Sequence, residues 1–279
     1  MIVALHEAPI DFFKTTPPHS NRKLEELIRK AASMNFGAVE IGPLQDYVSI
    51  DGKQLQVVLD SFKIARSVHV GGLFNAKRFA LKDEEYTKAR EQIHRGITLC
   101  REIDSPLASI HPPFFVSQDK ANETLMSRAR QRFLELVNEE VDFATENNIK
   151  LAVESFCYCP FIFKDLQDFC RFISQFPVQK VGVLLDAGHV YQAGIDLSEA
   201  VNAFSCRLMN VHVHDATLER DYQRATHLPI GKGTINFSTL IDCLRNVHYD
   251  GWLTLEIRAT EDEVIRSKEV LEQLITSKS

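Results

Sequence analysis

The chain has 279 residues, of which 44% are hydrophobic and 25% are charged, and its formal net charge at pH 7 is −6. The negative balance provides no overall basic field, which disfavours an obligate nucleic-acid partner, although a local patch could still bind one. No apolar run approaches the roughly 20 residues of a membrane span, the start M-I-V-A-L-H-E-A has no signal-peptide pattern, and the cysteines are scattered, so we expect a cytoplasmic protein without a membrane partner.

Short segments rich in β-branched and aliphatic residues recur along the chain and predict eight strands. They are 2–5, 38–42, 67–70, 107–111, 149–154, 181–186, 208–213 and 252–257. Between them, apolar residues recur every three or four positions, which is typical of amphipathic helices. Segments 83–103 and 123–147 show this spacing most clearly.

The alternation of strands and helices predicts an α/β fold, a single (β/α)8 TIM barrel that occupies residues 1–279 as one domain. Several of the strands are nearly continuous apolar runs, as expected for a parallel sheet that is buried on both faces. A doubly wound open sheet is the competing fold. It would normally carry a glycine-rich turn after the first strand, whereas L-H-E-A-P stands there.

Histidines and carboxylates stand at the ends of the later strands or just beyond them. They are His69, His111, Glu154, Asp186, His189, His212, His214, His227 and Glu256. In a TIM barrel these ends form one rim, which is where active sites lie. A carboxylate that leaves water must be paired or bound to a metal. Few arginines or lysines stand nearby, so the pattern predicts a divalent metal site for Zn²⁺, Mn²⁺, Co²⁺ or Fe²⁺, with Mg²⁺ also possible.

Each residue also has a structural interpretation. His69 alone could be a hydrogen-bonded strand histidine, Glu154 alone could belong to a buried ion pair, and Asp186 could cap the helix that follows it. The convergence of so many such residues on one rim favours the metal site.

The motifs H-x(5)-N, I-H-P-P, A-V-E, L-L-D-A-G-H, V-H-V-H-D, H-L-P-I-G-K-G and L-T-L-E follow one another along the chain. In this order they resemble the xylose-isomerase-like TIM barrel superfamily. That superfamily includes sugar isomerases and epimerases, inosose and dehydroshikimate dehydratases, and the endonuclease IV family.

The resemblance implies that Glu154, Asp186, His212 and Glu256 are metal ligands. It also implies that Glu154 and Glu256 are catalytic and transfer protons through an enediolate. The implied activity is isomerisation or epimerisation of a sugar, a sugar phosphate or a related polyol ketone. A dehydratase with the same metal and carboxylates is an alternative.

A second alternative is a metal-dependent phosphodiesterase like endonuclease IV. His69, His111, His189 and His227 match positions that hold additional zinc ions there, so the chain could bind one to three ions. Two departures weaken this alternative: Ala225 replaces a ligand of the third metal, and Gly72 stands where that family has an aromatic residue used against DNA.

Further residues are candidates for binding a small sugar-like substrate. By resemblance His189 contacts the substrate in epimerases, and we expect His214, Lys232 and Arg258 to do so too. The valine alternation in N-V-H-V-H-D places His212 and His214 on one face of a strand. The superfamily's H-x-x-D spacing then implies that His212 is the metal ligand and leaves His214 and Asp215 to contact the metal ligands from behind or to contact the substrate.

The remaining candidates lie around the same rim. Arg220 and Arg224 could contact an anion, and G-K-G at 231–233 could be a phosphate contact or a plain turn. His6, Glu7 and Glu40 could line the pocket, with Glu40 equally suited to a structural pairing. The apolar stretch F-C-Y-C-P-F-I-F after Glu154 could wall the pocket or form a homo-oligomer contact.

Overall fold

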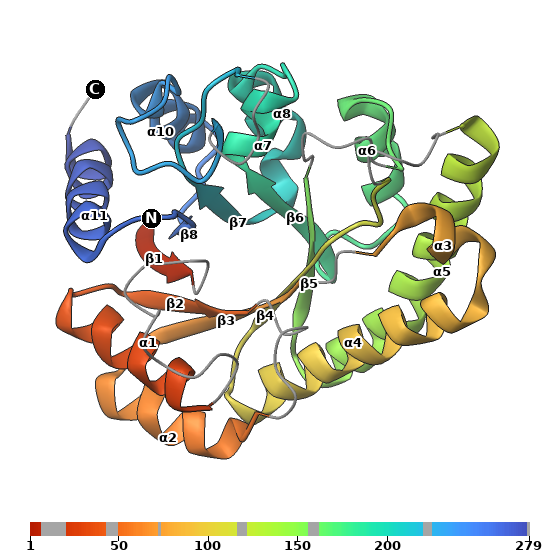
Figure 1. Cartoon of the computed structure of the whole chain (residues 1–279), viewed down its shortest axis with the longest axis horizontal. Helices are drawn as coiled ribbons and strands as arrows, with labels where there is room; N and C mark the ends of the chain where they lie inside the picture. The colour runs from red at the N-terminus through yellow and green to blue at the C-terminus, as the bar shows by residue number, and fades with distance from the viewer. Residues whose placement is uncertain are drawn as a thin grey trace.

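The computed structural model describes residues 1–6, 21–42, 50–71, 74–115, 122–155, 162–219 and 225–277. Eight parallel strands pair in chain order, and β1 also pairs with β8, which closes a barrel surrounded by helices (Figure 1). The strands are β1 (Ile2–His6), β2 (Ala38–Ile41), β3 (Ala65–Gly71), β4 (Leu107–Ile110), β5 (Lys150–Glu154), β6 (Val181–Asp186), β7 (Leu208–Val213) and β8 (Trp252–Leu255). The predicted (β/α)8 barrel and its strands are therefore confirmed, whereas the single domain over 1–279 stays a prediction.

The helices follow the strands around the outside of the barrel. They are α1 (Asn21–Ser33), α2 (Gly52–Phe62), α3 (Ala76–Leu81), α4 (Asp83–Glu102), α5 (Glu123–Glu146), α6 (Leu166–Ile173), α7 (Ala187–Gln192), α8 (Leu197–Phe204), the 3-10 turn η3 (Ser205–Arg207), α10 (Phe237–Asn246) and α11 (Glu261–Thr276). The predicted helical segments 83–103 and 123–147 correspond to α4 and α5. Among the described helices, none is both long enough and apolar enough to cross a membrane.

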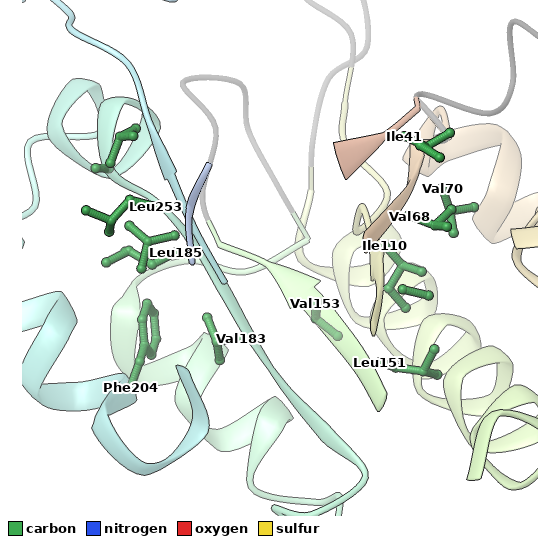
Figure 2. Close-up of a cluster of buried hydrophobic side chains, with 14 of the residues drawn as sticks. Ile41, Val68, Val70, Ile110, Leu151, Val153, Val183, Leu185, Phe204 and Leu253 are labelled. Atoms are coloured by element: carbon green, nitrogen blue, oxygen red, sulfur yellow. The ribbon is translucent and has the colours of Figure 1, made fainter. Parts of the chain in front are cut away.

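Alternate strand residues build two separate apolar clusters. One face of each strand packs against the helices, where Val153, Val183 and Leu185 join the main core with Phe204 (Figure 2). The other face points into the barrel, because successive side chains of a strand alternate. Inside the barrel, Leu107, Ala152 and Leu184 form a small cluster, against which Met209 and Trp252 pack. Trp252, the first residue of β8, therefore packs near the amino-terminal ends of the strands.

The inward positions become polar toward the carboxyl ends of the strands. Asn210 of β7 is paired in register with Trp252, whereas His212, two residues later, is paired with Asp186 and Thr254. On the other side of the barrel His6 is paired with Glu40. The polar side chains named here are all buried. The barrel therefore has a polar interior at the end where its active site is expected.

One glycine at this end is required by the backbone. Gly42, just after β2, has φ 141°, and a Cβ placed on it would lie 1.9 Å from the carbonyl oxygen of His69. Gly194 also has a positive φ, 74°, but a Cβ there would meet no atom within 4 Å. We predict that Gly42→Ala lowers the free energy of unfolding by about 3 kcal/mol or more, because a steric clash adds to the backbone strain.

The matched control is Gly194→Ala, for which only the backbone strain of about 1 kcal/mol applies. Urea unfolding of both variants measures the difference. Equal losses would show that the close approach of Gly42 to His69 does not constrain the barrel.

Candidate metal centre

The four metal ligands expected from the resemblance lie together at the carboxyl ends of β5 to β8. Ligand atoms of Glu154, Asp186 and His212 all lie within 4.8 Å of one another. The fourth, Glu256, follows β8 and places its Oε2 2.9 Å from His212 Nδ1. Glu154, Asp186 and His212 are almost fully buried. The structure thus brings the four residues into one centre.

Two polar atoms at this centre lack well-aligned hydrogen bonds from the described residues. Asp186 Oδ2 is buried and accepts no hydrogen bond from the described residues. It lies 3.8 Å from His212 Nδ1, a nitrogen that also forms no well-aligned hydrogen bond with the described part of the chain. Because a buried oxygen of a carboxylate normally has a partner, this set of donors fits a divalent cation.

Two histidines contact Glu154 from the neighbouring strands. His69 Nε2 lies 3.1 Å and His111 Nε2 lies 3.0 Å from Glu154 Oε2. Burial alone would raise the pKa of Glu154, but His111 and His69 outweigh burial and hold this pKa well below its usual range. Glu154, His69 and His111 also have the proximity needed for a second ion.

The other two carboxylates are also held in their charged forms. Burial would raise the pKa of Asp186, but His189 and His214 outweigh it and lower this pKa to about 2. The pKa of Glu256 is well below its usual range, because His227, His6 and His212 outweigh burial. The buried Glu154 and Asp186 and the partly buried Glu256 are therefore ionised at neutral pH, and three carboxylates together attract cations.

Glu40 of β2 has the most complete set of hydrogen-bond partners at this end of the barrel. Its Oε1 accepts hydrogen bonds from Ser67 Oγ at 3.1 Å and Asn210 Nδ2 at 2.9 Å. Its Oε2 lies 2.5 Å from His212 Nε2 and 3.6 Å from His6 Nε2. Of the two interpretations that the sequence left open for Glu40, the structure supports the pairing.

The contact with Glu40 decides which nitrogen of His212 faces the centre. A carboxylate requires a donor, so Nε2 of His212 donates to Glu40. Nδ1 is then the nitrogen that faces Asp186 and Glu256 and that would offer its lone pair to an ion. Metal-binding histidines usually donate their other N–H to a carboxylate or carbonyl in this way. The alternation in A-V-E-I indicates that the side chain of Glu40 points into the barrel. No pattern in the sequence indicates that its histidine partner lies on β7.

A third cluster contains His189, His214 and His227, whose ligand atoms lie within 4.8 Å of one another. His189 follows β6 at the start of α7, and its backbone N–H donates to Asp186 Oδ1 at 2.7 Å. His227 Nδ1 lies 3.1 Å from the carbonyl oxygen of Glu256. Burial, with a further contribution from His214, lowers the pKa of His227 to about 3.

The other predicted contacts lie farther toward solvent or outside the described residues. Lys232 and Arg258 are exposed. Asp215 fixes the G-K-G loop, because its carboxylate accepts hydrogen bonds from the N–H groups of Gly231, Ile235 and Ala216. The roles of Lys232 and Arg258 in substrate binding stay predictions.

Several further candidates lie outside the described residues. They are Glu7, Gly72, Arg220, Arg224 and most of the apolar stretch after Glu154.

The pairing of Glu40 with His212 predicts a pH dependence of stability. Burial would raise the pKa of Glu40, but His212 outweighs it and lowers this pKa from 4.5 to about 2. A lowered folded-state pKa contributes stability that is present above the unfolded-state value and is lost as the pH falls toward the folded-state value. Glu40→Gln should therefore destabilise the metal-free protein by about 3 kcal/mol near pH 6, and the difference from wild type should shrink as the pH falls below about 4.5 toward 2.

Urea unfolding of the metal-free proteins across this pH range measures the difference. Glu84→Gln serves as the control, since Glu84 is an exposed carboxylate paired with Lys88 on α4. A difference between wild type and Glu40→Gln that is independent of pH would contradict the charged pair.

The sequence shows similarity to several known proteins. An uncharacterised protein of Methanocaldococcus jannaschii is 25% identical over 258 residues, which cover 90% of this chain and 85% of that protein. A probable endonuclease 4 of Sulfurihydrogenibium sp. is 26% identical over 180 residues, and the match spans 60% of this chain and 62% of the endonuclease.

Solved structures share the fold over nearly the whole chain. A D-tagatose 3-epimerase-like protein superposes with a TM-score of 0.79 at 22% identity, covering 99% of this chain and 97% of that one. The D-psicose 3-epimerase of Clostridium cellulolyticum H10 superposes with a TM-score of 0.78 at 14% identity, covering 99% and 100%. The family model of the xylose isomerase-like TIM barrel matches residues 28–274. The chain therefore belongs to the xylose isomerase-like TIM barrel family.

Proposed function

We propose that this protein is a divalent-metal-dependent epimerase or isomerase that acts on a ketose or a related sugar. The observation that carries the proposal is the convergence of Glu154 and Glu256 on the same buried centre as Asp186 and His212. Sugar 3-epimerases among the solved structures with this fold support the same class of substrate.

The residues that hold the ion are Glu154, Asp186, His212 and Glu256, and their mixture of carboxylates and imidazole suits Zn²⁺ or Mn²⁺ best. A divalent ion bound there supplies Lewis-acid stabilisation of the negative charge that develops on the substrate oxygen. The protein's own side chains carry out the proton transfers.

The two glutamates move the protons. One of them removes the proton from the carbon beside the ketone, and the electron pair of the broken C–H bond moves into the carbonyl group to give an enediolate. The other takes the proton of the substrate hydroxyl group on that carbon and returns it to the opposite face of the carbon, which inverts it. The first glutamate then gives its own proton to the oxygen of that hydroxyl group, so both carboxylates are ionised again. Two carboxylates that are ionised in the resting protein can act as general bases, and His69 and His111 fix the orientation of Glu154 through its Oε2.

The second candidate function is metal-dependent phosphodiester hydrolysis. The cluster of His69, His111 and Glu154 favours it, because a second ion there would add the clamp that phosphate-ester chemistry uses. The similarity to probable endonuclease 4 proteins points in the same direction. The histidine cluster also serves the epimerase by orienting Glu154, and Ala225 stands at a position where a third-metal ligand is expected from the resemblance. We therefore prefer the epimerase.

Exchange of substrate protons with solvent tests the proposal. The protein loaded with Mn²⁺ is incubated in D2O with a panel of ketohexoses that includes D-tagatose, D-psicose and D-fructose, and NMR follows both the C–H signals beside the ketone and the appearance of epimers. We expect exchange and epimer formation with at least one ketose. Glu154→Gln should slow both by about 100-fold or more, because it removes a general base.

The exposed Glu84→Gln variant controls for a general effect of removing a carboxylate and should retain wild-type rates. The same preparation is tested for incision of DNA that contains an abasic site. Incision by a metal-loaded protein that exchanges no proton of any ketose would reject the epimerase in favour of the hydrolase.

A further inference from the structure

We propose that His214 is a positioning residue that holds Asp186 in place through a fixed tautomer, rather than a substrate contact or a ligand of the His189–His214–His227 cluster. This inference rests on the proposed function only in that Asp186 is taken as a metal ligand. It assigns a role to the second histidine of V-H-V-H-D. It also argues against a metal site at the His189–His214–His227 cluster, for which the structure's support is the proximity of the three rings.

The hydrogen bonds around the ring determine its tautomer. The backbone N–H of His227 donates to His214 Nδ1 at 3.0 Å. A backbone amide can only donate, so Nδ1 must present its lone pair. The carbonyl oxygen of Asp215, 3.3 Å from the same nitrogen, would need a proton on Nδ1, and that proton would collide with the amide hydrogen of His227. The proton of the neutral ring therefore sits on Nε2.

Nε2 of His214 lies 3.0 Å from Asp186 Oδ1. With its proton on this nitrogen, His214 donates a hydrogen bond to the carboxylate, and the negative charge of Asp186 favours that arrangement. Both ring nitrogens are then committed, one as an acceptor and one as a donor. Binding a metal at either nitrogen would require the ring to give up one of these bonds, so proximity alone does not make His214 a metal ligand in this cluster.

The fold provides a closely fitting site for this ring. His214 is fully buried, so a substrate cannot reach it without displacing other groups. A Cβ on Gly188 would lie 1.8 Å from Cε1 of His214, which shows that the ring lies directly against the backbone of D-A-G-H. Any side chain at position 188 would therefore collide with the ring of His214.

The consequence concerns the two oxygens of Asp186. Oδ1 accepts hydrogen bonds from the His189 backbone at 2.7 Å and from His214. Oδ2 is left toward His212 Nδ1. His214 thereby sets which oxygen of Asp186 is presented to the centre. It also links that oxygen to the loop after β7, since its other partner is the backbone of His227.

Two substitutions separate the donor at Nε2 from the acceptor at Nδ1. The amide of His214→Gln can place an N–H near the position of Nε2 and preserve the bond to Asp186. The shorter His214→Asn can accept from His227 but cannot reach Asp186. Titration of the metal-free protein with Mn²⁺, followed by electron paramagnetic resonance, measures the affinity of each variant without any substrate.

We expect His214→Asn to weaken Mn²⁺ binding by about 10-fold or more, as is typical when a hydrogen-bond partner of a ligand is removed, and His214→Gln to restore most of the affinity. Urea unfolding of both variants shows whether the difference follows stability instead. Equal losses of affinity in the two variants, or no loss in either, would overturn the inference while leaving the proposed function intact. A wild-type protein that does not bind Mn²⁺ would overturn both.

The tautomer itself provides a test that involves no metal. Proton–nitrogen correlation spectra of the metal-free protein, with His214 assigned by comparison with the His214→Gln variant, should show His214 protonated at Nε2 and unprotonated at Nδ1. A proton on Nδ1 would reject the assignment directly.

Discussion

A carboxylate can be buried in a protein only if donors or cations compensate the charge that leaves water. At the carboxyl ends of the strands, Glu40, Asp186 and Glu154 are all buried, and the structure compensates them in different ways. Glu40 is surrounded by serine, asparagine and histidine donors. Glu154 is contacted by two histidines. Asp186 keeps one oxygen without a hydrogen bond from the described residues, and this asymmetry identifies where a cation would bind.

The barrel makes this arrangement possible through the alternation of its strands. Outward side chains such as Val183 and Leu185 supply the apolar contact with the helices. Inward positions are therefore free to change from Leu184 to Asp186 within one strand. Since parallel strands place their carboxyl ends at the same rim, the same change in neighbouring strands gathers polar groups that are far apart in the sequence.

Much of this could be predicted from the sequence, because it depends on local periodicity. The strands, the closed barrel and the convergence of Glu154, Asp186, His212 and Glu256 follow from alternation and from the rule for the rim. The pairing of Glu40 with His212 could not be predicted, since it joins residues 172 positions apart. The contacts of His214 also escaped prediction, because they depend on a backbone N–H in the loop after β7 and on the absence of a side chain at Gly188.

The proposed function requires that Glu154, Asp186, His212 and Glu256 form a divalent metal site. Anomalous X-ray diffraction from crystals of the wild-type protein grown with Mn²⁺ tests it most directly. We expect an anomalous peak bonded to Asp186 Oδ2 and His212 Nδ1, with both glutamates within coordinating distance. A fully occupied peak elsewhere in the barrel, or no peak among these four residues at saturating Mn²⁺, would contradict it.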